Sequence, residues 1–131
     1  MNPSGPPKLI LYVEDSPVNA ALIEEYVSHM QGVEIMIAVT GEKGVTLAHE
    51  RRPDLVLMDI NLPGMNGVDV MEALRKKGEG FAKIPFIALS ADAVNEEIER
   101  TLDAGFDDYL TKPIFFDKLK EVLMQHLHLD V

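Results

Sequence analysis

Five short apolar runs alternate along the chain with segments of helical periodicity, and this alternation limits the possible folds more than any other feature. The runs lie at 9–13, 33–39, 55–58, 84–89 and 108–110. A short, continuous apolar run is typical of a strand that is buried on both faces of a sheet. The pattern therefore predicts an α/β fold with a parallel sheet that helices cover on both faces.

The segments that follow the apolar runs carry the start and stop signals of helices. Ser16 and Pro17 are typical of an N-cap and a first helical position, and Thr40 and Pro53 bracket a second helix. The five expected helices cover about 16–32, 40–52, 68–77, 94–105 and a final segment through 119–127. Turn residues at 63–67 and 78–80 flank the third helix. The sequence thus predicts a doubly wound sheet of five strands with five helices.

Length and composition restrict the class of protein. A chain of 131 residues has the size of one domain, which we expect to occupy 8–131 after a disordered tail or linker remnant at 1–7. The net charge of -10 argues against binding to nucleic acid or an anionic membrane. No cysteine is present and no apolar run approaches the roughly 18 residues that span a bilayer. We expect a cytoplasmic protein.

The residues directly after the apolar runs are polar, and most of them are charged. They are Glu14, Asp15, Asp59, Ser90, Thr111 and Lys112. Parallel strands bring their carboxyl ends to one edge of the sheet, where α/β proteins bind ligands. Carboxylates about 5 Å apart repel by roughly 3 kcal/mol per pair at an effective dielectric constant near 20. A hard divalent cation offsets this repulsion, and an all-oxygen ligand set favours Mg²⁺ over Zn²⁺.

Asp59, placed between such a cation and an ammonium group, could attack a phosphorus atom. Lys112 and Mg²⁺ would neutralise the phosphoryl oxygens, and Ser90 could donate a hydrogen bond to one of them. These residues describe an acyl-phosphate site.

Four motifs in this order resemble the receiver domain of two-component response regulators, the CheY-like family. They are LILYVEDSPVN at 9–19, LVLMDINLPGMNG at 55–67, IALSA at 87–91 and DDYLTKP at 107–113. The resemblance extends over residues 8–128. It implies a flavodoxin-like sheet with strand order 2-1-3-4-5, a topology that comes from the resemblance to this family and not from the spacing. It also implies a cis peptide bond before Pro113.

The resemblance assigns roles around the metal. Asp59 would be the phosphoacceptor, forming 4-aspartylphosphate. Asp15 and Asp59 would contact Mg²⁺ directly, and Glu14 would act through a water molecule. The backbone carbonyl of Asn61 would supply a further ligand.

The resemblance also assigns roles in switching. Ser90 would be the switch hydroxyl, Tyr109 the switch aromatic residue and Lys112 the cation that binds the phosphoryl group. Asn61 and Asp92 would flank the pocket and tune the dephosphorylation rate.

The function that follows from the resemblance is phosphorelay signal transduction. A sensor histidine kinase or a histidine phosphotransfer protein would supply the phosphoryl group. A downstream protein would bind the face formed by the fourth helix, the fifth strand and the fifth helix.

The resemblance also implies a protein that assists its own phosphorylation and dephosphorylation without being a turnover enzyme. It would be a monomer or a weak phosphorylation-dependent dimer. It would be a single-domain regulator or a receiver excised from a hybrid kinase.

An alternative is a phosphatase of the haloacid-dehalogenase type with Asp59 as nucleophile. Such enzymes carry a second aspartate two residues later as general acid, and here that position is Asn61. A nucleotide- or flavin-binding domain is a third hypothesis, but no G-x-G-x-x-G follows the first strand.

Overall fold

One parallel sheet organises the molecule, and its strand order is β2-β1-β3-β4-β5. The computed structural model describes residues 6–62, 64, 66–76 and 80–128. The strands are β1 (Lys8–Val13), β2 (Val33–Ala38), β3 (Leu55–Asp59), β4 (Phe86–Ser90) and β5 (Asp108–Thr111). The helices are α1 (Pro17–Ser28), α2 (Gly41–Glu50), α3 (Gly67–Lys76), α4 (Asn95–Asp103) and α5 (Phe116–Leu127). The predicted fold and strand order are confirmed.

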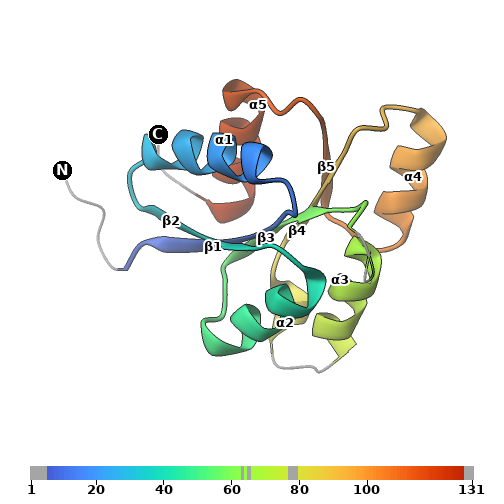
Figure 1. Cartoon of the computed structure of the whole chain (residues 1–131), viewed down its shortest axis with the longest axis horizontal. Helices are drawn as coiled ribbons and strands as arrows, with labels where there is room; N and C mark the ends of the chain where they lie inside the picture. Colours follow the sequence, from blue (N-terminus) through green and yellow to red (C-terminus); the bar gives the residue numbers. More distant parts are fainter. Residues whose placement is uncertain (1–5, 63, 65, 77–79, 129–131) are drawn as a thin grey trace.

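Helices cover both faces of this sheet, as the apolar runs predict (Figure 1). Alternate residues of β1 face opposite sides, so Ile10 and Tyr12 pack in the cluster beneath α1 and α5. Leu11 and Val13 pack in the cluster beneath α2 and α3. α4 lies beside β5. Burial on both faces explains why β1, β3 and β4 lack a polar side.

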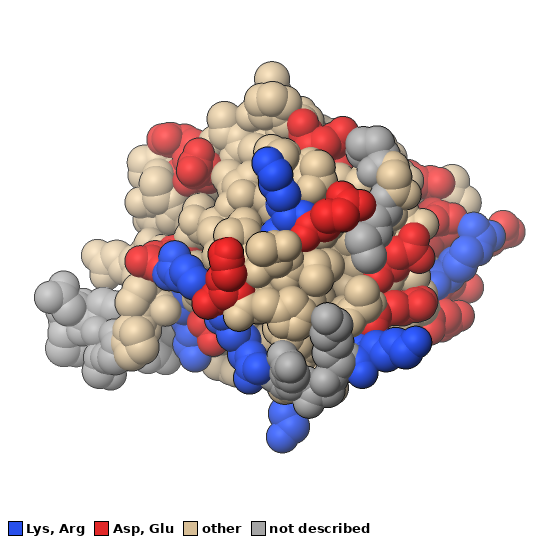
Figure 2. Space-filling model, turned by 60° about the horizontal axis from the view of Figure 1, so that its bottom comes forward, with Lys and Arg blue, Asp and Glu red and all other residues tan. Residues whose placement is uncertain are grey.

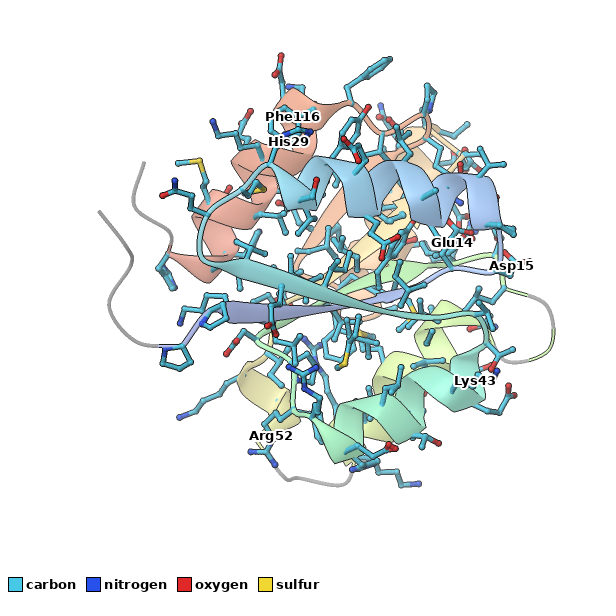
Figure 3. All side chains as sticks on the ribbon, turned by 60° about the vertical axis from the view of Figure 1, so that its left-hand side comes forward. Glu14, Asp15, His29, Lys43, Arg52 and Phe116 are labelled. Atoms are coloured by element: carbon cyan, nitrogen blue, oxygen red, sulfur yellow. The ribbon has the colours of Figure 1, made fainter. Side chains whose placement is uncertain are left out.

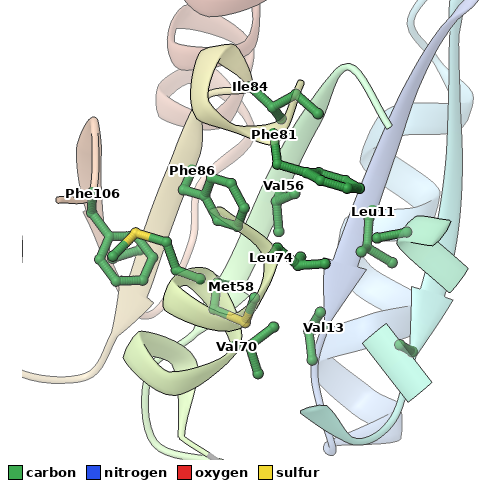
Figure 4. Close-up of a cluster of buried hydrophobic side chains, with 14 of the residues drawn as sticks. Leu11, Val13, Val56, Met58, Val70, Leu74, Phe81, Ile84, Phe86 and Phe106 are labelled. Atoms are coloured by element: carbon green, nitrogen blue, oxygen red, sulfur yellow. The ribbon is translucent and has the colours of Figure 1, made fainter. Parts of the chain in front are cut away.

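The core on the side of α2 and α3 is built from aliphatic and aromatic side chains that β1, β3 and β4 contribute (Figure 4). Phe86 and Phe106 meet edge to face, with ring centroids 6.4 Å apart. Val56 and Met58 of β3 are fully buried beside them. Close packing of this kind fixes the positions of the strands, and therefore the positions of the residues at their ends.

The predicted start of the fourth strand differs from the structure. β4 begins at Phe86, whereas the apolar pattern placed its start at Ile84. Residues Phe81–Lys83 form a short 3-10 helix, and the N–H of Ile84 donates to the carbonyl of Phe81 at 3.2 Å. Ile84 is therefore bound to this turn, and Pro85, which has no N–H, separates it from the strand.

Some predictions fall on residues outside the described part of the chain. They concern residues 1–5 of the expected tail, residues 63 and 65 of the first turn, residues 77–79 at the end of the third helix, and residues 129–131.

Gly67 lets α3 begin directly beside the end of β3. A Cβ atom at this position would lie 2.9 Å from the backbone oxygen of Asp59 and 3.1 Å from the Cα of Ile60. The N–H of Gly67 donates to the carbonyl of Ile60 at 3.2 Å and closes the loop between them. The absence of a side chain at Gly67 thus permits the close return of the chain to the strand that ends in Asp59.

The surface is predominantly acidic, in keeping with the net charge of -10. On the described part of the face in Figure 2, basic side chains lie scattered among acidic ones and form no continuous patch. Within the described residues, no helix combines the length and the apolar character needed to cross a bilayer.

The N-cap of α1 fixes the chain immediately after the acidic pair at the end of β1. The Oγ of Ser16 accepts a hydrogen bond from the N–H of Asn19 at 3.3 Å. We predict that Ser16→Ala lowers the free energy of unfolding by about 1 kcal/mol, because a helix N–H loses its partner. Ser16→Asn, which keeps a capping oxygen, should retain most of the stability in urea denaturation. Equal stability of Ser16→Ala and the wild type would contradict this role of the cap.

Candidate functional site

Three carboxylates converge at the carboxyl ends of β1 and β3, as the sequence predicts. Oxygen atoms of Glu14, Asp15 and Asp59 all lie within 4.8 Å of one another. Glu14 and Asp15 follow β1 and lie together at its end (Figure 3). Asp59 is the last residue of β3. Glu14 is only 1% exposed and Asp59 only 4%, whereas Asp15 is open to solvent.

Lys112 joins the two buried carboxylates. Its Nζ donates to Oε1 of Glu14 and to Oδ2 of Asp59, each at 3.1 Å. The peptide bond between Lys112 and Pro113 is cis, which confirms the expectation from the last motif. Burial lowers the pKa of the ammonium, but the hydrogen bonds to Glu14 and Asp59 and the charges of both carboxylates raise it above its ordinary value overall. Lys112 is therefore a cation at neutral pH.

The carboxylate of Glu14 is held by two further donors. The hydroxyl of Tyr12 donates to Oε1 at 2.8 Å, and the N–H of Ser16 donates to Oε2 at 3.2 Å. The pKa of the Tyr12 phenol is raised far above its ordinary value. The largest cause is burial, followed by the charge of Glu14, the hydrogen bond to Glu14 and the charge of Asp59.

The role of Tyr12 was missed in the sequence, where it counted only as an apolar strand residue. A signal was present, however. Tyr12 and Glu14 are two residues apart, which places both on one side of an extended segment. A tyrosine buried in an otherwise aliphatic strand requires a partner for its hydroxyl.

Asp59 is fixed from two sides. Its Oδ2 accepts from Lys112, and its Oδ1 accepts from the backbone N–H of Asn61 at 3.0 Å. The side chain of Asn61 is exposed at the edge of the site. The carboxylate is thus oriented at the strand end before any ligand binds.

Ser90, Asp92 and Tyr109 form a second connected group. Oγ of Ser90, which is only 2% exposed, accepts from the N–H of Asp92 at 3.1 Å. The Tyr109 hydroxyl donates to the carbonyl of Asp92 at 2.6 Å. The carboxylate of Asp92 accepts from the N–H of Val94 at 2.9 Å, next to the start of α4. The two expected switch residues are therefore linked through the backbone of Asp92.

The charge balance and the donor atoms of the site fit a hard divalent cation. Three carboxylates against one ammonium leave two negative charges in excess at one edge of the sheet. All the candidate ligand atoms are oxygens, and the exposed carboxylate of Asp15 leaves one side accessible to solvent. Mg²⁺ binds such sites through a few carboxylates and keeps several water ligands. The residues present therefore fit Mg²⁺.

Comparison with known proteins decides the family. A sequence model of the response regulator receiver domain matches residues 10–124. The chain belongs to the response regulator receiver domain family. It is 35% identical over 121 residues to the polar-differentiation response regulator DivK of Brucella anthropi, covering 92% of this chain and 97% of that protein.

Receiver domains within sensor kinases are equally similar. The chain is 36% identical over 118 residues to the sensor protein GacS of Pseudomonas syringae, but it spans only 13% of that protein. The crystal structure of the receiver domain of the sensor histidine kinase PA1611 from Pseudomonas aeruginosa PAO1 superposes with a TM-score of 0.84 at 33% identity. That alignment covers 94% of this chain and 99% of the other, which has a magnesium ion coordinated in its active-site cleft.

These matches establish a receiver domain of two-component phosphorelay signalling. They give no support to the haloacid-dehalogenase alternative. Those phosphatases are a different family that also uses an aspartate nucleophile at a strand end. The relatives include both a response regulator of similar length and a sensor protein several times longer.

The raised pKa values of Tyr12 and Lys112 predict a loss of stability at alkaline pH. In the unfolded chain these groups release protons around their ordinary pKa values of 10.0 and 10.5, whereas the folded receiver retains them. The folded state then binds more protons, so the free energy of unfolding falls as pH rises above about 10. The slope reaches about 1.4 kcal/mol per pH unit for each group.

The measurement is urea denaturation at a series of pH values between neutrality and pH 11. Tyr12→Phe should make the alkaline decline shallower, because one of the two groups is gone. A decline of unchanged slope in Tyr12→Phe would contradict the assignment to Tyr12.

Proposed function

We propose that Asp59 accepts a phosphoryl group from the phosphohistidine of a sensor kinase or a histidine phosphotransfer protein, and that Mg²⁺ is required. The observation that carries the proposal is the convergence of Glu14, Asp15 and Asp59 with Lys112 at one edge of the sheet. Asp59 is the member that contacts Lys112 and also receives the Asn61 N–H, so its carboxylate is both oriented and paired with a cation.

In the proposed transfer, a carboxylate oxygen of Asp59 attacks the phosphorus atom and forms a P–O bond. The P–N bond to the donor histidine breaks, and its electron pair returns to the imidazole nitrogen. A phosphoimidazole protonated on its other nitrogen leaves as neutral imidazole, so Asp59 gives up no proton. Lys112 provides a positive charge beside the reacting oxygen, and such charges stabilise the transferring group electrostatically.

Asp15 and Asp59 would hold Mg²⁺ directly, the backbone carbonyl of Asn61 would add a ligand, and Glu14 would act through water. When bound, the cation supplies further neutralisation of the phosphoryl oxygens. The excess of two negative charges at the site supports this assignment, as does the magnesium ion in the PA1611 receiver domain. Asp15 is exposed, which suits a metal that retains its waters.

Phosphorylation is proposed to act as a switch through Ser90 and Tyr109. A phosphoryl oxygen at Asp59 would attract the Ser90 hydroxyl, which now accepts from the Asp92 N–H. Because Tyr109 is bound to the carbonyl of the same Asp92, a change at Ser90 reaches Tyr109 through one residue. Asn61 and Asp92, at the edge of the pocket, would tune the lifetime of the phosphoryl group.

The output face is proposed to comprise α4, β5 and α5, where it would bind a downstream protein. A groove of about 520 Å³ lies along this face. Its lining includes Ile98, Leu102, Tyr109, Ile114, Phe115 and Lys118. Phe115 is 64% exposed and Leu102 39%, so apolar surface is available to a partner.

Residues 8–131 would form one receiver domain, and 1–7 would serve as a tail or linker. We place the protein in the cytoplasm, as a monomer that forms at most a weak dimer on phosphorylation. Its net charge of -10 argues against a nucleic-acid or membrane partner. It would act as a phosphoacceptor and not as a turnover enzyme, whether alone or as part of a hybrid kinase.

The test is intact mass after incubation with acetyl phosphate and Mg²⁺. We predict a single phosphoryl adduct in the wild type, and none in Asp59→Asn or in the presence of EDTA, because the first lacks the anionic nucleophile and the second the cation. Asp117→Asn, a matched change at an exposed position in the first turn of α5, should be labelled like the wild type. Labelling of Asp59→Asn to the wild-type extent would overturn the assignment.

A further inference from the structure

We propose that Tyr12 is a positioning residue, whose hydroxyl holds the Glu14 carboxylate in place while Lys112 moves from Glu14 to the incoming phosphoryl group. The inference deepens the proposed function and rests on the role assigned there to Lys112. Tyr12 does not touch the phosphoryl group; it acts through Glu14.

The first observation is that a phenol occupies a place where an aliphatic side chain would suffice for packing. Tyr12 is 0% exposed, and its neighbours in β1 from Leu9 to Val13 are all aliphatic. The other buried members of its cluster beneath α1 and α5 are aliphatic side chains such as Ile23 and Leu57. A buried hydroxyl carries a large desolvation cost unless it finds a hydrogen-bond partner. Its partner is the buried carboxylate of Glu14, at 2.8 Å.

The second observation is that Tyr12 and Lys112 donate to the same oxygen. Oε1 of Glu14 receives the Tyr12 hydroxyl at 2.8 Å and the Lys112 ammonium at 3.1 Å, while Oε2 receives only the Ser16 N–H among the described contacts. At 1% exposure Glu14 has little access to water. A carboxylate this deeply buried is costly unless donors remain beside it.

The third observation is that Lys112 donates hydrogen bonds of equal length to two carboxylates. Its Nζ lies 3.1 Å from Glu14 and 3.1 Å from Asp59. Two of the three N–H groups of the ammonium are engaged in these bonds. The negative charge of a phosphoryl oxygen on Asp59 would attract the ammonium and lengthen one of the two contacts. The contact with Glu14 is the one that does not involve the phosphorylated side chain.

Tyr12 differs from Lys112 because its position does not depend on the reacting group. The core beneath α1 and α5 packs around its ring, and its hydroxyl bonds to Glu14, not to Asp59. It can therefore remain on Oε1 when Lys112 departs. Without that hydroxyl, departure of Lys112 would leave Oε1 of a buried carboxylate without a donor from the described residues, and this would oppose the movement.

The main test is the rate of phosphorylation of Tyr12→Phe at saturating acetyl phosphate and Mg²⁺. Phe keeps the ring in the core and removes only the hydroxyl. We expect the rate constant to fall roughly tenfold, as for a lost hydrogen bond to a charged group. The control is Tyr26→Phe, which removes a phenol from α1 where the ring packs 5.4 Å from that of Phe116. The control should be phosphorylated at the wild-type rate.

A role in packing alone predicts a different result. Tyr12→Phe would then be phosphorylated at the wild-type rate, whatever happened to its stability, and the inference would be overturned. Thermal unfolding of both variants separates the two effects, because a slower reaction in a protein that is folded at the assay temperature is not a folding defect.

A double-mutant cycle in urea denaturation, without Mg²⁺ or phosphodonor, tests the same claim independently of phosphorylation. Tyr12→Phe should reduce the folding equilibrium constant at least about fivefold more in a Lys112→Met background than in the wild type. In that background Lys112 no longer donates to Oε1 of Glu14, and Tyr12 is the remaining donor among the described side chains. Additive effects would overturn the inference. If the wild type accepted no phosphoryl group, the proposed function would fail, and the cycle would still decide the role of Tyr12.

Discussion

Electrostatic repulsion among Glu14, Asp15 and Asp59 is the constraint on which the rest of the site depends. Their oxygens lie within 4.8 Å, and two of the three side chains have almost no access to water. Lys112 neutralises one charge, and two remain in excess. This unbalanced state favours a divalent cation and, with it, a phosphoryl group whose negative oxygens need both positive partners.

The fold maintains this arrangement by assembling it from distant parts of the chain on rigid elements. Lys112 lies 98 residues from Glu14 and 53 from Asp59, yet it contacts both. Strands buried on both faces hold the acidic ends in register, and Gly67 allows α3 to begin against the end of β3. The cost of holding like charges together is thus offset by a core that lies on both sides of the sheet. In the proposed switch, the change begins in the loop between β4 and α4, where Asp92 connects Ser90 to Tyr109.

The sequence predicted the gathering of Glu14, Asp15, Asp59 and Lys112, because parallel strands bring their carboxyl ends to one edge whatever the details of packing. The strand order came from the resemblance to receiver domains. What could not be predicted depends on side-chain direction and local hydrogen bonds. The bond from Tyr12 to Glu14 and the link through Asp92 are of this kind. The late start of β4 is another, since an apolar Ile84 gives no sign that its N–H is taken by a 3-10 turn.

An acyl phosphate on Asp59 can be detected most directly by peptide mass mapping after phosphorylation with acetyl phosphate. Reduction with sodium borohydride converts an aspartyl phosphate to homoserine. We predict homoserine at position 59 alone, and only when Mg²⁺ was present during phosphorylation. Homoserine at the position of Asp15 instead, or a phosphoryl group that resists borohydride, would contradict this prediction.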